Sequence, residues 1–377
     1  MPVVGFSDWK NTTEFIVALG VFMEICLLLS ILLILAGIIC PDNYAVAFMQ
    51  YIWIVLVISF NFGGMDFGGN EFIYDNSEYI YEMQSDFGLS EFLSVYLAIA
   101  FKSVDFAYWE YNAMLTAVIL SVSFLYLLRN VKNPSLFFSF FMVYPLIYIV
   151  IQKRFAIATF FCIIAFLFLQ KDRKLLFLLF VFIASGFHIS ALFLLPFLFY
   201  KIKLLKNLFV IVLALVIEVI GVFIFNDVIL MTIADDSMKA LDYMAPDISF
   251  GAGLFFVSLQ VSSILFINKI ISCKDLGSKK NKEKEFICKI NIFSLFYIPL
   301  LMLNSVFFRY YRIIMLLSYI FVVDEAYGNK KWLIRAYILC IAVYVAILIT
   351  FGHFGWEEHL ETLFKYNKIL TYGEGLL

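Results

Sequence analysis

Three of the six arginines in this sequence lie where a membrane protein rarely carries one. Arg154, Arg309 and Arg312 each lie at the end of an apolar stretch whose other flank is rich in basic residues. Arginine at such a position opposes the positive-inside bias and costs free energy near hydrocarbon. Because a guanidinium group is always charged and presents a planar set of donors suited to phosphate, we predict that these residues bind an anion.

The arginines fall in two clusters with different spacing. The first is Gln152-Lys153-Arg154, between two apolar runs, where anchoring at the membrane interface is the alternative interpretation. The second contains Arg309 and Arg312, which share one face of a helix because they are three residues apart. Two guanidinium groups on one face repel unless an anion or an acid lies between them, and pairing with an acidic loop is the alternative here.

Aromatic, histidine and carboxylate side chains add further candidates. Tyr310 and Tyr311 could stack on a sugar ring, although an interfacial aromatic belt is the favoured interpretation. His188 lies in a break of a long apolar run beside Gly186, so it is either a core histidine or a residue lining a cavity. Asp75 is one of several carboxylates that could act as a general base, the alternative being a solvated acidic loop. The other carboxylates considered are Asp66, Glu71 and Asp86.

The composition of the chain indicates that membrane helices position these candidate site residues. The chain has 377 residues, of which 64% are hydrophobic and 15% charged, and its mean hydropathy is +0.96. Repeated apolar runs have the length of a bilayer-spanning helix, and helices satisfy their own backbone polar groups in lipid. We therefore predict an all-α, polytopic integral membrane protein. No small-residue cleavage site follows the first apolar run, so we expect no cleaved signal peptide.

The apolar runs predict about 10 to 12 transmembrane helices with re-entrant segments. Two segments, 89–106 and 175–200, could either cross the membrane or turn back within it. The other predicted spans are 15–40, 45–60, 112–128, 135–150, 155–170, 208–226, 251–273, 290–306, 307–323 and 333–351.

Charge distribution predicts the orientation of these spans. Lysine-rich loop 274–289 and several basic turns are expected on the cytoplasmic side, together with both flanks of 175–200. This pattern favours a hairpin that turns near Gly186 in that segment, the alternative being a single span with one basic flank on the other side. We expect residues 1–377 to form a single transmembrane domain, with an acidic external loop and interfacial helix at 61–111 and a second acidic external loop at 227–250.

Several classes of chemistry have no support in the sequence. The cysteines show no CxxC or Cys/His spacing, which predicts buried thiols and no metal site. No nucleotide-binding motif is present, and the net charge of −2 gives no reason to expect nucleic acid as a partner. We therefore expect no cofactor. The six cysteines are Cys26, Cys40, Cys162, Cys273, Cys288 and Cys340.

The order of motifs resembles that of the EpsG-like, Wzy-type polysaccharide polymerases, whose fold is GT-C-like. Gln152-x-Arg154 is followed by an apolar span, a basic turn at 171–174 and the sequence Ala-Ser-Gly-Phe-His-Ile-Ser-Ala-Leu at 184–192. Weaker matches are Asp75-x-x-x-Tyr79, Asp-Phe-Gly at 86–88 and Arg-Tyr-Tyr-Arg at 309–312. The resemblance covers about residues 60 to 325, and Lys153 departs from the family's usual apolar residue.

The resemblance implies an enzyme of the bacterial inner membrane that joins oligosaccharide repeat units carried on undecaprenyl diphosphate at the periplasmic or external face. Its partners would be this lipid-linked oligosaccharide, membrane lipid and a chain-length regulator protein. We expect Arg154, with Arg309 and Arg312, to hold the donor diphosphate and to stabilise the charge that develops on the leaving oxygen. Asp75 or His188 would accept the proton of the attacking hydroxyl. The expected substrate-binding residues are Gln152, Arg154, Arg309, Arg312, Tyr310, Tyr311 and Tyr79.

Two other functional classes fit parts of the pattern. A polytopic glycosyltransferase that adds one sugar from a polyprenyl-phosphate donor would also need external acids and arginines. A flippase or transporter of the lipid-linked unit should show charged residues along a path from both sides of the membrane, and often internal repeats. In this sequence the charges are concentrated on the predicted outer side and no clear repeat is present, which disfavours this class. A membrane acyltransferase is disfavoured because no acyl-transfer motif is present.

Overall fold

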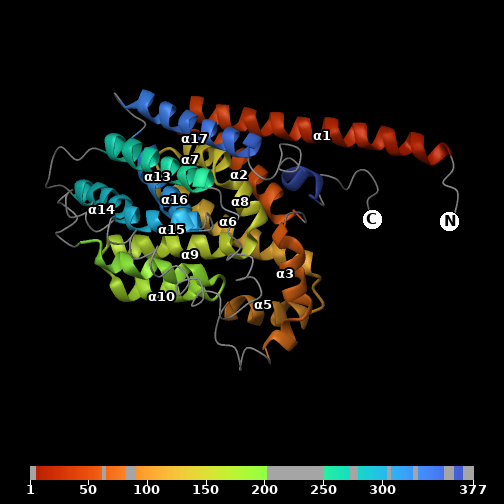
Figure 1. Ribbon diagram of the computed structural model, residues 1–377, viewed down its shortest axis with the longest axis horizontal. Helices are drawn as coiled ribbons and strands as arrows, with labels where there is room; N and C mark the ends of the chain where they lie inside the picture. Colours follow the sequence, from red (N-terminus) through yellow and green to blue (C-terminus); the bar gives the residue numbers. More distant parts are fainter. Residues whose placement is uncertain are drawn as a thin grey trace. The chain divides into compact units, whose positions relative to one another are not determined.

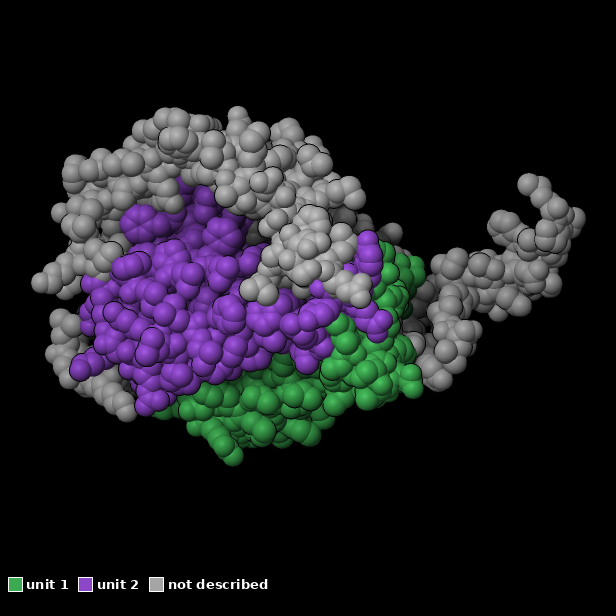
Figure 2. Space-filling model, turned by 90° about the horizontal axis from the view of Figure 1, so that it is seen from below, with its two compact units in different colours: residues 1–76, 98–156, 340–377 green, residues 77–97, 157–339 purple. Residues whose placement is uncertain are grey.

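The computed structural model describes residues 6–61, 65–81, 91–201, 250–271, 279–303, 307–325, 330–351 and 361–367. Within these ranges the chain is helical, and its extended pairing is limited to an isolated bridge between Asn61 and Asn367. The all-α fold class is therefore confirmed. The chain divides into two compact units (Figure 2). Unit 1 comprises residues 1–76, 98–156 and 340–377, and unit 2 comprises residues 77–97 and 157–339.

Long apolar helices identify a polytopic membrane protein. Among the described residues, four helices are long and apolar enough to cross a membrane, and several apolar helices are shorter. The four segments are Tyr108–Asn130, Lys153–Gln170, Gly253–Ile271 and Lys331–Thr350. The predicted span at 208–226 and nearly all of the predicted loop at 227–250 lie outside the described residues.

Unit 1 is built around packed helices from the first half of the chain (Figure 1). Helix α1 packs against α7 and α2, and α2 also packs against α6. The short helix α3 contacts α6 and α8. The bounds are α1 Phe6–Ile39, α2 Tyr44–Ser59, α3 Met65–Asp75, α6 Tyr108–Asn130, α7 Pro134–Val143, α8 Leu146–Ile151 and the π-helix η5 Glu361–Lys365.

Small and polar residues hold α1, α2 and α7 together. The Gln50 side chain donates to the Leu33 carbonyl at 2.9 Å and to Ser139 Oγ at 3.0 Å. A Cβ atom on Gly37 would lie 2.2 Å from Ser139 Oγ and 2.5 Å from the Ser135 carbonyl oxygen. Close helix approach at a glycine, with hydrogen bonds across the contact, is how membrane helices associate without a hydrophobic driving force between them.

The predicted span 135–150 is two helices rather than one. Helix α7 ends at Val143 and α8 begins at Leu146, with Tyr144 in extended conformation before Pro145. A proline disfavours helical conformation in the residue before it, so Pro145 ends α7.

Unit 2 contains the remaining helices. Helix α13 packs against α14, α15 and α16, and the 3-10 helix η1 packs against α10 and α16. Because α14 begins at Lys279, part of the segment predicted as loop 274–289 is helical. The bounds are α10 Lys174–Ser185, η1 Ile189–Phe199, α13 Phe250–Ile271, α14 Lys279–Phe293, η3 Ser294–Tyr297, α15 Ile298–Leu303 and α16 Phe308–Val323. Helices α5 Phe92–Lys102, α9 Lys153–Gln170 and α17 Lys331–Phe351 each contribute residues to both units.

The 175–200 segment turns back on itself. Helix α10 ends at Ser185, the chain breaks at Gly186 to His188, and η1 then packs along α10. Asp172 precedes α10 and Lys201 follows η1, and their side chains form an ion pair at 2.9 Å. The two flanks therefore lie at the same end, which confirms the predicted hairpin.

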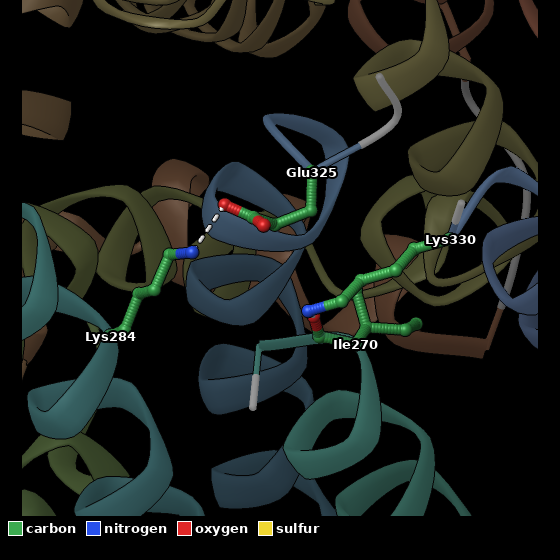
Figure 3. A network of polar contacts seen from close by, with 4 residues as sticks. All are labelled: Ile270, Lys284, Glu325 and Lys330. Atoms are coloured by element: carbon green, nitrogen blue, oxygen red, sulfur yellow. Dashed lines mark hydrogen bonds and ion pairs between the residues drawn. The ribbon is translucent and has the colours of Figure 1, made fainter. Parts of the chain in front are cut away.

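A polar network joins the basic ends of several unit 2 helices (Figure 3). Lys284 of α14 forms an ion pair of 2.8 Å with Glu325, which directly follows α16. Lys330 donates a hydrogen bond to the carbonyl of Ile270 in the last turn of α13. A cation at the carbonyl end of a helix is favourable because it complements the helix dipole. These contacts place Lys284 beside the end of α16 and Lys330 beside the end of α13.

The described cysteines are free thiols. Cys26 and Cys162 are buried, as predicted, and Cys288 and Cys340 are half-buried. Cys40 is exposed, so the prediction of burial is wrong at this position. Cys40 directly follows α1, whose last residue, Ile39, is itself 72% exposed.

Candidate functional site

The Gln152-Lys153-Arg154 cluster lies at the junction between α8 and the start of α9, within unit 1. Helix α8 ends at Ile151 and α9 begins at Lys153. The main-chain N–H of Gln152 donates to the last turn of α8 at 2.8 Å, and its carbonyl accepts the first bond of α9 from Ala156 at 2.8 Å. The main chain of Gln152 therefore makes the last hydrogen bond of α8 and the first of α9. These two bonds fix the backbone from which the side chains of Lys153 and Arg154 project.

Lys153 and Arg154 take different paths from this junction. Lys153 is 5% exposed and donates to the carbonyl of Ile58 at the end of α2. Because Lys153 is buried, it is not an anchor at the membrane interface, and that alternative interpretation is wrong for this residue. Arg154 is half-buried in the first turn of α9, where the helix dipole favours negative charge and a cation requires compensation. An anion bound there would be stabilised by the helix end and by the guanidinium together.

Arg154 is held by a residue that the sequence analysis did not identify. Its Nε–H donates to Asn70 Oδ1 at 2.6 Å, and Asn70 is 7% exposed. This contact fixes the guanidinium through its Nε edge. The sequence signal that could have identified Asn70 is its spacing of four residues from Tyr74, which places both on one face of α3.

Aromatic packing anchors α3 on α6. The ring of Tyr74 lies 5.6 Å from that of Tyr108 and 5.1 Å from that of Tyr111. Burial raises the pKa of Tyr74, with a further contribution from the charge of Asp75. Its hydroxyl therefore remains protonated and donates to the carbonyl of Phe106 at 2.6 Å. This packing holds Asn70 in position one turn earlier on the same helix.

The carboxylate predicted as a base lies at the end of α3. Asp75 is exposed, and its main-chain carbonyl accepts a hydrogen bond from Lys102 Nζ at 2.6 Å. Lys102 thus holds the end of α3 through the main chain. Tyr79, on the unit 2 side of the boundary between the units, is 62% exposed. The side chains of Asp66 and Asp86 lie outside the described residues, and Glu71 is exposed.

In unit 2, the break in the hairpin is held by α5. The main-chain N–H of Ser94 donates to the carbonyl of Gly186 at 3.1 Å, and its hydroxyl donates to the carbonyl of Phe187 at 3.3 Å. A Cβ atom on Gly186 would lie 2.7 Å from Cγ and Cδ1 of Leu93. A side chain at position 186 would therefore require Leu93 of α5 to move.

His188 follows this break and begins η1. Its Nδ1 accepts a hydrogen bond from the main-chain N–H of Ser190 at 3.3 Å, and Ser190 Oγ lies 2.7 Å from the same nitrogen. On the other edge of the ring, Nε2 lies 3.5 Å from Nη1 of Arg309. The structure therefore brings two predicted site residues together that are 121 positions apart in the chain.

Arg309 and Arg312 are not equally accessible. Both belong to the first turns of α16, but Arg309 is half-buried whereas Arg312 is 5% exposed. Arg309 is thus the arginine of this pair that a ligand can reach directly.

The two tyrosines between these arginines belong to the core. Tyr310 is 3% exposed and its ring lies 4.9 Å from that of Phe193. Tyr311 is 2% exposed and its hydroxyl donates to Asn291 Oδ1 at 3.4 Å. The predictions of an interfacial aromatic belt or of sugar stacking are therefore wrong for both. Tyr310 and Tyr311 are buried because α16 packs against α13, α14 and η1.

A comparison with protein families decides the classification. A model of the EpsG family matches residues 44–367. The chain belongs to the EpsG family. No match was found among curated proteins or among solved structures.

Membership of the EpsG family confirms the resemblance seen in the sequence. The match extends beyond the predicted range of about 60 to 325 and includes α2 and α17. This member of the EpsG family is thus a membrane protein of the polysaccharide-polymerase type, which is glycosyltransferase-like. Both cation groups, Arg154 in unit 1 and Arg309 with Arg312 in unit 2, lie within the matched residues.

Proposed function

We propose that this protein joins oligosaccharide repeat units carried on undecaprenyl diphosphate at the outer face of the bacterial inner membrane. The observation that carries the proposal is that each unit of an EpsG-family protein holds a half-buried guanidinium in the first turn of a helix, Arg154 in α9 and Arg309 in α16. Positive charge near the membrane core is costly and is retained where it serves a ligand or a pathway. Diphosphate is the anion that the family's substrates would bring.

The proposed reaction is a glycosyl transfer between two lipid-linked chains. A hydroxyl oxygen of the acceptor forms a bond to the anomeric carbon of the donor, and the bond from that carbon to the diphosphate oxygen breaks. The electron pair remains on the leaving undecaprenyl diphosphate, and the hydroxyl proton passes to a base. Asp75 and His188 are the candidate bases from sequence. Preorganised cations stabilise charge that develops on the leaving oxygen, particularly where the dielectric constant is low.

Two lipid-linked chains bring two diphosphates, and the protein offers two groups of cations. Arg154 is one group, held by Asn70, and Arg309 with Arg312 is the other. We propose that each group serves a diphosphate of the substrates. A chain-length regulator protein is a further proposed partner.

Gel analysis of surface polysaccharide tests this function. A strain deleted for the gene is complemented with the wild type, with Arg154→Gln, with Arg309→Gln or with Arg129→Gln. Arg129 is an exposed arginine in the last turn of α6 and serves as a matched control. We expect the deletion to leave single repeat units on their acceptor, and only the wild type and Arg129→Gln to restore the ladder, with all proteins present in the membrane.

Other outcomes of the same gel would overturn the proposal in distinguishable ways. A repeat unit shortened by one sugar would indicate a glycosyltransferase that uses a polyprenyl-phosphate donor. Complete loss of the repeat unit from the outer surface, with the unit accumulating inside, would indicate a flippase.

A further inference from the structure

The imidazole ring of His188 has donors near both of its nitrogens. The main-chain N–H of Ser190 lies 3.3 Å from Nδ1, and Nη1 of Arg309 lies 3.5 Å from Nε2. A main-chain N–H and a guanidinium N–H can donate but cannot accept. A neutral imidazole has one nitrogen that accepts and one that carries hydrogen, so it can accept only one of these two bonds.

The contacts with Ser190 decide which nitrogen accepts. Nδ1 receives the main-chain N–H of Ser190 as the cap of η1, and Ser190 Oγ lies 2.7 Å from the same atom. The serine hydroxyl can rotate, so it donates to Nδ1 as well. The hydrogen of the ring is then on Nε2. The doubly protonated form is disfavoured because it would set an N–H of Nδ1 against the N–H of Ser190 and a second positive charge beside Arg309.

With this tautomer, the contact between His188 and Arg309 joins two donors. Nε2–H and Nη1–H cannot bond to each other, and their separation of 3.5 Å is at the limit for any hydrogen bond. A single oxygen about 2.8 Å from each nitrogen could accept from both, which is the usual length of a charge-assisted hydrogen bond. Both side chains are half-buried.

We infer that His188 Nε2–H and Arg309 Nη1–H together bind one phosphate oxygen of a lipid diphosphate. The identity of the ligand rests on the proposed function. His188 is then an anion-binding residue and not the base that accepts the acceptor's proton, so Asp75 remains the candidate base. The backbone break at Gly186 and the cap of η1 fix the ring before the ligand arrives, and preorganised donors of this kind stabilise developing negative charge.

Nitrogen-15 NMR of the purified full-length protein tests the tautomer independently of activity. The chain has three histidines, so His353→Gln and His359→Gln together leave the signals of His188 alone. We expect an unprotonated Nδ1 and a protonated Nε2 at neutral pH. Hydrogen on Nδ1 would overturn the inference, because Nε2 would then accept from Arg309.

Two substitutions of His188 separate its role as a donor through Nε2–H from its role as the N-cap of η1. In His188→Asn, the side-chain oxygen can still accept from the Ser190 N–H, but no donor reaches the position of Nε2. In His188→Gln, the longer amide places an N–H near that position. With farnesyl diphosphate as the probe and purified full-length protein, we expect His188→Asn to weaken binding about tenfold or more and His188→Gln by less than about threefold.

The outcomes distinguish this inference from the proposed function. If the wild type binds farnesyl diphosphate and both substitutions weaken binding equally, the donor pair is wrong while the polymerase remains supported. If the deletion strain keeps an intact ladder, the proposed polymerase is overturned, together with the assignment of a lipid diphosphate as ligand. Arg309→Gln should weaken binding at least as much as His188→Asn, and unchanged binding in Arg309→Gln would also overturn the inference.

Discussion

Arg154 donates its Nε–H to Asn70 Oδ1 over 2.6 Å, which joins the start of α9 to α3 within unit 1. The carbonyl oxygen of Asn70 is neutral, so it orients the guanidinium without cancelling its charge. The guanidinium therefore keeps its positive charge in the first turn of α9. This contact makes Asn70 a positioning residue whose removal should affect function through Arg154.

Substitutions of Asn70 should separate orientation from charge. We expect Asn70→Ala to lower polymer synthesis about tenfold or more, because a hydrogen bond to a charged group is lost. Asn70→Asp should lower it at least as much, because the carboxylate would neutralise Arg154. The measurement is the rate of ladder formation at equal amounts of membrane protein. Asn76→Ala is the matched control, since the Asn76 side chain donates only to the carbonyl of Phe72 one turn earlier. Equal effects of Asn70→Ala and Asn76→Ala would contradict the positioning role.

Gly186 should tolerate no side chain unless Leu93 is shortened. A Cβ atom would lie 2.7 Å from the Leu93 side chain, and overpacking of this kind costs about 1 to 3 kcal/mol. We expect Gly186→Ala to lower the melting temperature of the purified protein, and Leu93→Ala in the same chain to recover part of the loss. At Gly68, where an added Cβ meets nothing within 4 Å, Gly68→Ala should not lower the melting temperature. The absence of any recovery in the double variant would show that the contact is not the cause.

The ion pair of Lys284 and Glu325 should stabilise unit 2. Their side chains are only 18% and 14% exposed, so either charge alone would be poorly solvated. We expect Glu325→Gln to lower stability by about 1 to 2 kcal/mol, and Lys284→Glu to lower it more by placing two acids together. Combining Lys284→Glu with Glu325→Lys should recover most of the loss in a thermal unfolding assay. Additive losses in the combined variant would count against a direct pair.

The ion pair that closes the hairpin should respond to acid. A hydrogen bond from Lys201 lowers the pKa of Asp172 below its ordinary value of 3.8, and the same contact raises the pKa of Lys201 above 10.5. The depressed pKa of Asp172 contributes stability that is present above its unfolded value and is lost as the pH falls through the folded value. The raised pKa of Lys201 contributes stability that is present below 10.5 and is lost as the pH rises through its folded value.

Hydrogen exchange of the η1 segment measures this effect. We expect Asp172→Asn to increase exchange at pH 7, and the difference from the wild type to disappear as the pH falls through the lowered pKa of Asp172 and the carboxylate becomes protonated. The effect should be small because both side chains are largely exposed. A difference between the two proteins that persists in acid would mean that the ion pair is not its source.

The amino-acid sequence by itself determined the helical fold and many of the helix positions, and it favoured the hairpin. Apolar runs must form helices in lipid whatever their neighbours, and the basic residues on both flanks of 175–200 require the segment to return. The contact between Asp172 and Lys201 is the structural consequence of that charge pattern. The break at Pro145 was also encoded locally, in the restriction that proline imposes on the residue before it.

Only the tertiary structure decided which side chains meet. Asn70 and Arg154 are 84 positions apart, and His188 and Arg309 are 121 positions apart, so no local pattern brings either pair together. Residue type alone did not predict which side chains are buried, since Lys153 is 5% exposed and Tyr79 is 62% exposed. Helix formation depends on residues within a few turns, whereas these contacts depend on how whole helices pack, and packing is fixed by shape and polarity over many residues at once.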